Sequence, residues 1–320
     1  MKPLLYYFTR LKDIYASHYF PVFKQKPYPK DFYKETELAN KLILDLLHSE
    51  RPCLISRFGS NELYATISYI KGHHPFWMLR KIFPFWVSPQ VDYHMKNNAG
   101  FFNSNHKEYS KFSDLMVKCA KEIDILGSWQ ENEYIMNKYL SCNSIHLDAL
   151  VPFFVREPWT KYLEGKKVLV VHPFRNTILN QYEQREHLFS NNNILPKFSK
   201  LTVIKAIQTS RGEVANNFNT WFDALHAMEA EIDKADYDIA LIGCGAYGMP
   251  LAAHCKEMGK QAIHLGGALQ LLFGIKGKRW ETEGFYKDKY SPLMQNPYWT
   301  HPSDSEKPQK PMIDRDNCYW

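Results

Sequence analysis

Residues 243–248, GCGAYG, form a G-x-G-x-x-G motif and constrain the fold more than any other part of the chain. The apolar run 237–243 before the motif is typical of a buried strand, and residues 248–258 after it have helical spacing. A second apolar strand is predicted at residues 261–265. Two strands joined through a helix run parallel, so the sequence predicts an α/β fold with a Rossmann-like, mostly parallel sheet flanked by helices.

The rest of the chain supports the same fold class. Residues 167–173 form the most apolar segment, and further strands are predicted at residues 52–59, 123–129 and 201–207. A helix is expected to follow Ser60 or Asn61, because a polar side chain at either position can cap it. Another helix is predicted over residues 217–234, where apolar side chains share one face.

The regularity fades after residue 280, where repeated prolines predict extended pieces and turns. Residues 72–102 also lack a clear period, which is typical of a long loop or a pair of short helices. Such segments often carry binding groups, although many are only packed. We therefore predict an N-terminal helical segment, a Rossmann-like domain and an irregular C-terminal tail packed on the body. Their bounds are residues 1–45, 46–280 and 281–320.

Composition excludes several classes of protein. With 45% hydrophobic residues among 320, the chain can bury a large core. Its six cysteines include no C-x-x-C pair, which argues against a zinc cage or a disulfide framework and favours the cytoplasm. The net charge of +6 suits anionic substrates, but no nucleic-acid-binding motif accompanies it, so we expect no nucleic-acid partner.

No segment of the sequence is long and apolar enough to cross a bilayer. Residues 1–35 are basic and aromatic, so peripheral contact of this N-terminal helix with the inner face of a membrane is one interpretation. Packing of the helix on its own domain is the simpler one.

The glycine motif has a chemical interpretation as well as a structural one. Gly243, Gly245 and Gly248, with Tyr247 between them, would let the backbone approach a diphosphate at a helix N-terminus. The alternative is that the glycines only permit a tight turn. Dinucleotide enzymes place an acidic residue about 20 positions later, but residues 261–267 contain none. This argues against NAD and S-adenosylmethionine and favours a nucleoside diphosphate.

A second glycine pair, Gly266 and Gly267, follows the next strand. Parallel strands end at the same edge of a sheet, so this loop should open beside the glycine motif, with Gln270 close by. Lys276 and the cations at positions 278 and 279 are candidates to neutralise a phosphate. An exposed basic turn is the alternative.

Residues 56–62, SRFGSNE, mark another strand-to-helix turn. Arg57 can hold a phosphate through two hydrogen bonds, and Gly59, Ser60 and Asn61 complete the predicted binding turn. Glu62 is a candidate base or a ligand for a divalent ion. The alternative is an exposed arginine and a first-turn acid that complements the helix dipole.

Two more polar segments end predicted strands. His172 can transfer a proton or bind a phosphate or sugar hydroxyl, and Arg175 can hold an anion at the start of the next helix. A buried, hydrogen-bonded histidine is the alternative for His172. Within residues 127–133, Trp129 can stack on a sugar or base, and the two glutamates are candidate bases. Ordinary packing and helix capping are the simpler interpretation of that segment.

Three of these segments carry a family resemblance: residues 57–62 (RFGSNE), 243–248 (GCGAYG) and 264–270 (HLGGALQ). Over roughly residues 50–280 the chain resembles the GT-D-fold bacterial glycosyltransferases, once grouped as a domain of unknown function. The resemblance implies a single Rossmann-like domain that transfers a sugar from a nucleoside diphosphate donor during surface polysaccharide or glycoprotein assembly.

The chain departs from that family at one position. In the better-known members, an Asp-x-Glu motif binds a divalent metal beside the donor diphosphate, whereas this chain has Ser60 in place of the aspartate and keeps Glu62. One carboxylate is a poor metal site by itself. Either Glu62 and water hold Mg²⁺ or Mn²⁺, or Arg57, backbone N–H groups and the cations near Lys276 balance the charge. We favour the second arrangement.

We therefore predict an enzyme that moves a glycosyl group to a hydroxyl of a glycan or lipid-linked acceptor, with Arg57, Glu62 and His172 as catalytic residues. Two other functions stay open. The glycine motif also suits a nucleotide-cofactor enzyme such as a methyltransferase or reductase. The loss of the aspartate also suits a noncatalytic nucleotide- or sugar-binding partner in an assembly complex.

Overall fold

The computed structural model describes residues 24–72, 89–103, 105–209, 215, 217–282 and 284–307. Within them the chain forms one seven-stranded sheet in the order β3-β2-β1-β7-β6-β4-β5. The strands are β1 (Cys53–Ser56), β2 (Ile125–Ser128), β3 (Asn143–His146), β4 (Lys167–His172), β5 (Lys200–Lys205), β6 (Ile239–Ile242) and β7 (Gln261–His264). All neighbouring strands run parallel, which confirms the predicted α/β fold.

Short apolar runs form most of these strands because the sheet is buried on both faces. β1, β2, β6 and β7 are buried at every position, and β4 at all but its first. A parallel sheet covered by helices on both sides requires such continuous burial. The sequence analysis missed β3 because this edge strand is polar, with its first two residues exposed.

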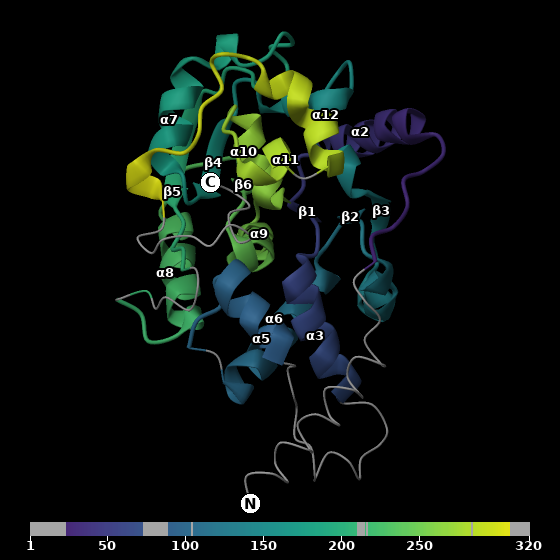
Figure 1. Ribbon diagram of the computed structural model, residues 1–320, viewed down its shortest axis with the longest axis vertical. Coiled ribbons are helices and arrows are strands. Elements are labelled where there is room, and N and C mark those ends of the chain that lie inside the picture. Colours follow the sequence, from purple (N-terminus) through teal and green to yellow (C-terminus); the bar gives the residue numbers. More distant parts are fainter. Residues whose placement is uncertain are drawn as a thin grey trace, which may run out of the picture.

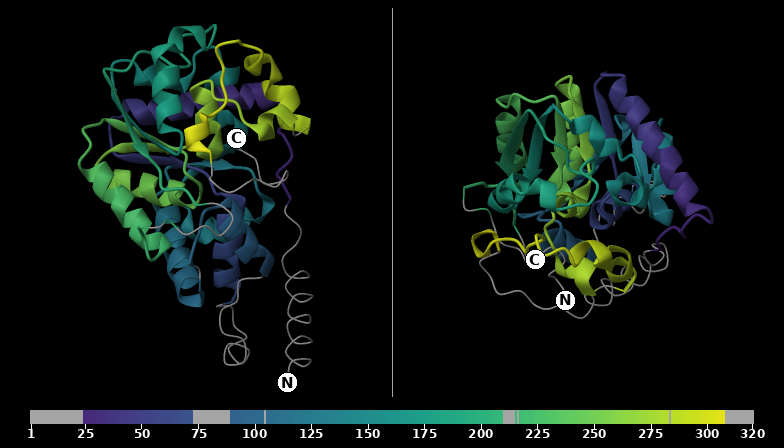
Figure 2. Two further views of the ribbon diagram at one scale, coloured as in Figure 1. Left: turned by 60° about the vertical axis from the view of Figure 1, so that its left-hand side comes forward. Right: turned by 90° about the horizontal axis from the view of Figure 1, so that it is seen from above.

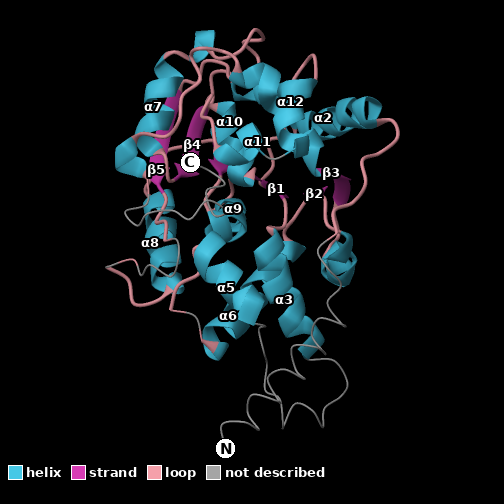
Figure 3. Cartoon of the chain, viewed as in Figure 1, coloured by secondary structure: helices cyan, strands magenta, loops and turns pink. Residues whose placement is uncertain are grey.

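Helices cover the two faces of the sheet in two groups (Figures 1 and 3). Along β4, Leu169 and Val171 pack with one group, while Val168 and Val170 pack with the other. The first group is α3 (Ser60–Gly72), α5 (Pro89–Asn98), α6 (His106–Lys121), α8 (Trp221–Asp233) and α9 (Gly248–Glu257). The second is α2 (Phe32–His48), α7 (Arg175–Glu183), α10 (Leu269–Leu272), α11 (Lys278–Thr282) and α12 (Gly284–Met294). Figure 2 shows this layered arrangement from two further sides.

The segment after residue 280 differs from its predicted irregular structure. Helix α12 contains Pro292, yet Tyr290 and Met294 are buried in the cluster on the α2 side of the sheet. Burial of these large side chains outweighs the local cost of the proline. Beyond the helix, the Glu306 carboxylate accepts a hydrogen bond from the Asn176 N–H at 2.6 Å. The described part of the tail is thereby anchored on α7.

The N-terminal elements also refine the sequence analysis. Helix α2 runs past residue 45, and its Ile43 and Leu47 lie in the same cluster. Helix α3 begins at Ser60, and the carbonyl of Gly59 accepts from the Leu63 N–H at 2.9 Å, so neither Ser60 nor Asn61 is the cap. None of the helices in the described ranges has the length and hydropathy needed to cross a bilayer. The expected membrane contact falls largely on residues 1–23, which lie outside the described residues.

Candidate functional site

A cavity of about 350 Å³ lies at the carboxyl edge of the sheet. Four adjacent strands point into it: Arg57 follows β1, His172 ends β4, Gly243 follows β6 and His264 ends β7. After β1 the chain continues to β2, toward one end of the sheet. After β4 it continues to β5, toward the opposite end. Open parallel sheets bind ligands where the connections diverge in this way.

Most of the residues that the sequence analysis selected line this cavity. They are Arg57, Gly59, Ser60, Asn61, Glu62, His172, Gly243, Gly245, Tyr247, Gly266, Gly267 and Gln270. Arg175, Gly248 and Lys276 are not among the lining residues. Arg175 is exposed on the first turn of α7, and the main chain of Lys276 pairs with Thr300 at 2.7 Å. Of the three basic residues at 276, 278 and 279, Arg279 is the one at the cavity.

The glycine motif packs against protein at each of its three glycines. A Cβ on Gly243 would lie 2.5 Å from the Gly266 carbonyl oxygen, and one on Gly248 would overlap the His264 ring. Gly245, with a φ of +58°, makes room for the carbonyl of Ala99, which accepts the Ala246 N–H at 3.1 Å. The glycine turn therefore packs closely against the Ala99 loop and the segment around His264 and Gly266. An anion in the cavity would be bound by residues next to this turn.

We expect Gly243→Ala to lower the free energy of unfolding by roughly 1–3 kcal/mol, because the added methyl group meets a main-chain carbonyl that cannot easily move. Chemical denaturation would measure the change. The matched control is Gly284→Ala, where an added Cβ meets nothing within 4 Å. A Gly243→Ala protein with unchanged stability but lost nucleotide binding would show that the glycine serves ligand approach instead of packing.

Arg57 is the best placed anion-binding side chain of the site. Its guanidinium lies 5.4 Å from the centroid of the Trp129 ring, and its Nη1 donates to the Phe58 carbonyl at 3.0 Å. Its Nε is buried and has no hydrogen-bond partner within the described residues. Gly266, which has a φ of +61°, leaves room for the Arg57 side chain, since a Cβ on Gly266 would lie 3.2 Å from that Nε. A buried N–H without a partner favours an anionic ligand here.

Glu62 lies in the first turn of α3 with 9% of its surface exposed. Its carboxylate folds back over Gly59, so a side chain at position 59 would displace that carboxylate. Burial raises the pKa of Glu62, and the nearby positive charge of Arg57 opposes that shift. A carboxylate with a raised pKa is a stronger base than an ordinary glutamate and is suited to accept a proton.

Two buried histidines reach the cavity, and burial lowers the pKa of each to about 3. His172 accepts the Phe174 N–H at its Nδ1, at 3.1 Å. His264 pairs with the Ser56 hydroxyl through its Nδ1, also at 3.1 Å. Both rings are therefore neutral at physiological pH. The sequence analysis did not select His264 as a site residue, because its neighbours gave no chemical signal apart from the glycines that follow it.

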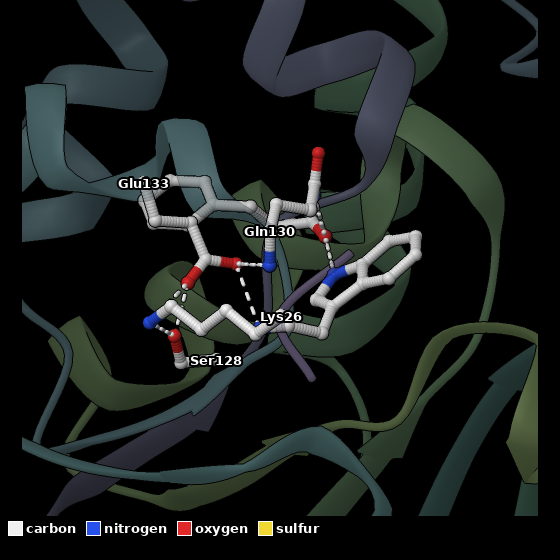
Figure 4. A network of polar contacts seen from close by, with 6 residues as sticks. Lys26, Ser128, Gln130 and Glu133 are labelled. Atoms are coloured by element: carbon white, nitrogen blue, oxygen red, sulfur yellow. Dashed lines mark hydrogen bonds and ion pairs between the residues drawn. The ribbon is translucent and has the colours of Figure 1, made fainter. Parts of the chain in front are cut away.

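In the segment after β2, Glu133 caps the turn, as the simpler interpretation predicted (Figure 4), whereas Trp129 lines the cavity. The Glu133 carboxylate accepts the N–H groups of Trp129 and Gln130 at 3.1 and 3.2 Å, and it also pairs with Ser128 and Lys26. These contacts fix the turn, so that the Trp129 indole can donate to the Phe58 carbonyl at 2.8 Å and flank Arg57. The structure thus gives Glu133 a capping role.

The sequence analysis named no individual residue on the side of the cavity formed by α5 and the loop after β5, although it considered binding groups within residues 72–102. His94, Asn97, Asn98, Gln208 and Thr209 line this side, and α12 contributes Tyr286. The Gly100 carbonyl accepts from the Thr209 hydroxyl at 2.9 Å, which ties the two segments together. No regular spacing in residues 72–102 signals this arrangement, because it depends on a contact between distant segments.

The described lining of the cavity is a poor match to a Mg²⁺ or Mn²⁺ site built from protein ligands alone. Glu62 is the single carboxylate among the described residues that line it. Nowhere in the described ranges do three or more His, Cys, Asp or Glu side chains cluster in a way that could hold a metal ion. Both ions prefer several oxygen ligands, whereas the carboxylate here faces the positive charge of Arg57.

Comparison with known proteins found a matching family and a similar solved structure. Residues 35–272 match the family described as the GT-D fold-like domain. The chain is also similar to a solved structure described as a selenomethionine-substituted domain of unknown function 1792 (DUF1792). The similarity has a TM-score of 0.38 at 12% identity and covers 74% of this chain and 82% of that chain. No curated protein sequence matches the chain.

Proposed function

This chain belongs to the family of the GT-D fold-like domain, a glycosyltransferase-type fold, and from that membership we propose that it transfers a sugar from a nucleoside diphosphate donor to an acceptor hydroxyl. One observation carries the proposal. The buried Nε of Arg57, which has no partner among the residues that the structure describes, and the N-terminus of α3 meet at the carboxyl edge of the sheet. Both groups favour an anion, and the negative charge of the two phosphates of a sugar nucleotide is complementary to them.

The reaction follows from the groups around this anion site. The acceptor oxygen forms a bond to the anomeric carbon of the sugar, and the bond from that carbon to the diphosphate oxygen breaks. Glu62 takes the proton of the acceptor hydroxyl. Arg57, the first N–H groups of α3 and Arg279 balance the charge that develops on the departing nucleoside diphosphate, in place of a metal ion.

The opposite side of the cavity supports a neutral, polar portion of the ligand. Asn97, Asn98 and Gln208 line the cavity and offer amide donors and acceptors there. Amide groups can pair with several sugar hydroxyls at once because each amide both donates and accepts. We assign this side to the sugar of the donor.

The acceptor and the cellular setting rest on the sequence resemblance. We propose a glycan or lipid-linked acceptor in bacterial surface polysaccharide assembly, and a cytoplasmic enzyme that contacts the membrane peripherally. Rival functions make different predictions for ligand binding, and the following experiment separates them.

Purified protein should bind one or more members of a panel of sugar nucleotides in calorimetry or thermal shift, and should release the nucleoside diphosphate when a suitable acceptor is present. A response to NAD or S-adenosylmethionine with none to sugar nucleotides would instead identify a nucleotide-cofactor enzyme. Binding without turnover, across a broad set of acceptors, would favour a noncatalytic partner. The matched comparison is the Arg57→Ala protein, in which the binding response should be clearly weaker.

A further inference from the structure

His172 occupies a fixed position at the base of the cavity. It is the last residue of β4 and is only 3% exposed. Its ring lies 4.8 Å from the Phe174 ring, and its Cδ2 would be 3.2 Å from a Cβ on Gly243. Contacts on two sides thus hold the imidazole in one orientation.

The hydrogen bond at Nδ1 determines which nitrogen carries the proton. The Phe174 N–H donates to Nδ1 at 3.1 Å, and this is the hydrogen bond that the ring makes within the described residues. A neutral imidazole has one donor and one acceptor nitrogen. Because Nδ1 is the acceptor, Nε2 bears the hydrogen, and it is the polar atom of the ring that remains for a ligand in the cavity.

Burial keeps this ring neutral. It lowers the pKa of His172 to about 3, and no charged side chain contributes to that shift. The charged groups that line the cavity in the described residues are Arg57, Glu62 and Arg279, and its other histidines are His94 and His264. His172 therefore keeps one protonation state over the whole physiological pH range.

We infer that His172 is a fixed hydrogen-bond donor, which offers its Nε2–H to an anionic phosphate oxygen and does not accept the proton of the acceptor hydroxyl. The nature of the ligand rests on the proposed function. A donor held in place by the protein stabilises negative charge without rearranging when the charge develops. Glu62 is then the proton acceptor among the cavity side chains described above.

The tautomer can be tested without any ligand. In the ¹⁵N-labelled protein, long-range ¹H–¹⁵N correlation spectra should show His172 with an unprotonated Nδ1 and a protonated Nε2, unchanged between about pH 5.5 and 8.5. The His172→Asn protein identifies the signals. A ring that titrates near its ordinary pKa, or that carries its proton on Nδ1, would overturn the inference.

Two substitutions separate the donor role from a structural one. His172→Asn keeps an oxygen that can accept the Phe174 N–H but loses the donor at the position of Nε2. His172→Gln has the opposite properties, since its amide nitrogen reaches that position. We expect Asn to weaken binding of inorganic pyrophosphate and of nucleoside diphosphates by roughly tenfold to a hundredfold, and Gln to retain most of it. The reverse order would assign the ring a purely structural role.

The pH dependence completes the test. The ratio of affinities between the native protein and His172→Asn should stay constant from about pH 5.5 to 8.5, because a neutral donor does not titrate in that range. If pyrophosphate binding depends on His172 but no sugar is transferred, the proposed function fails and the donor role stands. If neither pyrophosphate nor any nucleoside diphosphate binds the native protein, the donor role itself is overturned.

Discussion

Replacing Arg57 with alanine should lower kcat/KM for sugar transfer by roughly 100- to 1000-fold, the loss expected when a positioned charge donor is removed from a transition state. The side chain is held between Trp129 and Gly266, and its buried Nε has no other partner in the described residues. Steady-state kinetics with the preferred sugar nucleotide would measure the loss. Calorimetry should show weaker binding of the nucleoside diphosphate as well.

Two further variants make this result specific. Arg57→Lys should recover little activity, because lysine lacks the planar fork that stacks on an aromatic ring and holds two phosphate oxygens. Arg175→Ala removes an exposed arginine outside the cavity and should leave kinetics unchanged. Native activity in Arg57→Ala, or an equal loss in Arg175→Ala, would place the anion site elsewhere.

Glu62→Gln should reduce kcat by roughly 100- to 10,000-fold while the donor nucleotide still binds, because the amide cannot accept the proton of the acceptor hydroxyl. The pH dependence has a definite sign. Burial raises the pKa of Glu62, so the active, ionised form is lost as pH falls through that raised pKa. The native rate should therefore increase with pH across a range above the ordinary value for glutamate.

The matched control for this variant is Glu131→Gln, which changes an exposed glutamate near the same edge of the sheet. Its rate and pH profile should equal those of the native protein. Thermal unfolding of both variants distinguishes lost chemistry from lost structure. A Glu62→Gln enzyme with the native rate and pH profile would exclude Glu62 as the base.

Much of the fold could be predicted because parallel strands leave a local signal. Segments such as β4 and β6 are short apolar runs, which a sheet buried on both faces requires, and helix α9, which joins β6 to β7, follows a recognisable glycine turn. The position of the cavity follows too, since the carboxyl ends of parallel strands meet at one edge. Polar β3 and proline-containing α12 were not predicted because tertiary packing outweighs their local sequence.

The residues of the candidate site likewise fall into those that the sequence predicted correctly as cavity residues and those that it did not. Arg57 and Glu62 were predicted because both lie in one strand-to-helix turn, close in sequence and in space. Arg175 and Lys276 were placed in the site by their charge, and the structure puts them outside the cavity lining. Charge is visible in a sequence, but the direction in which a turn presents it depends on neighbouring elements.

The sequence by itself determined the class of fold, the edge of the sheet that forms the site and the strand-to-helix turn that carries Arg57. Only the tertiary structure decided what the glycine motif does, because the Ala99 carbonyl and the His264 ring reach it from distant parts of the chain. Likewise, the Phe174 N–H sets the tautomer of His172 through a turn whose geometry no residue pattern encodes. Periodicity records local burial, whereas contacts between loops arise only when the whole sheet assembles.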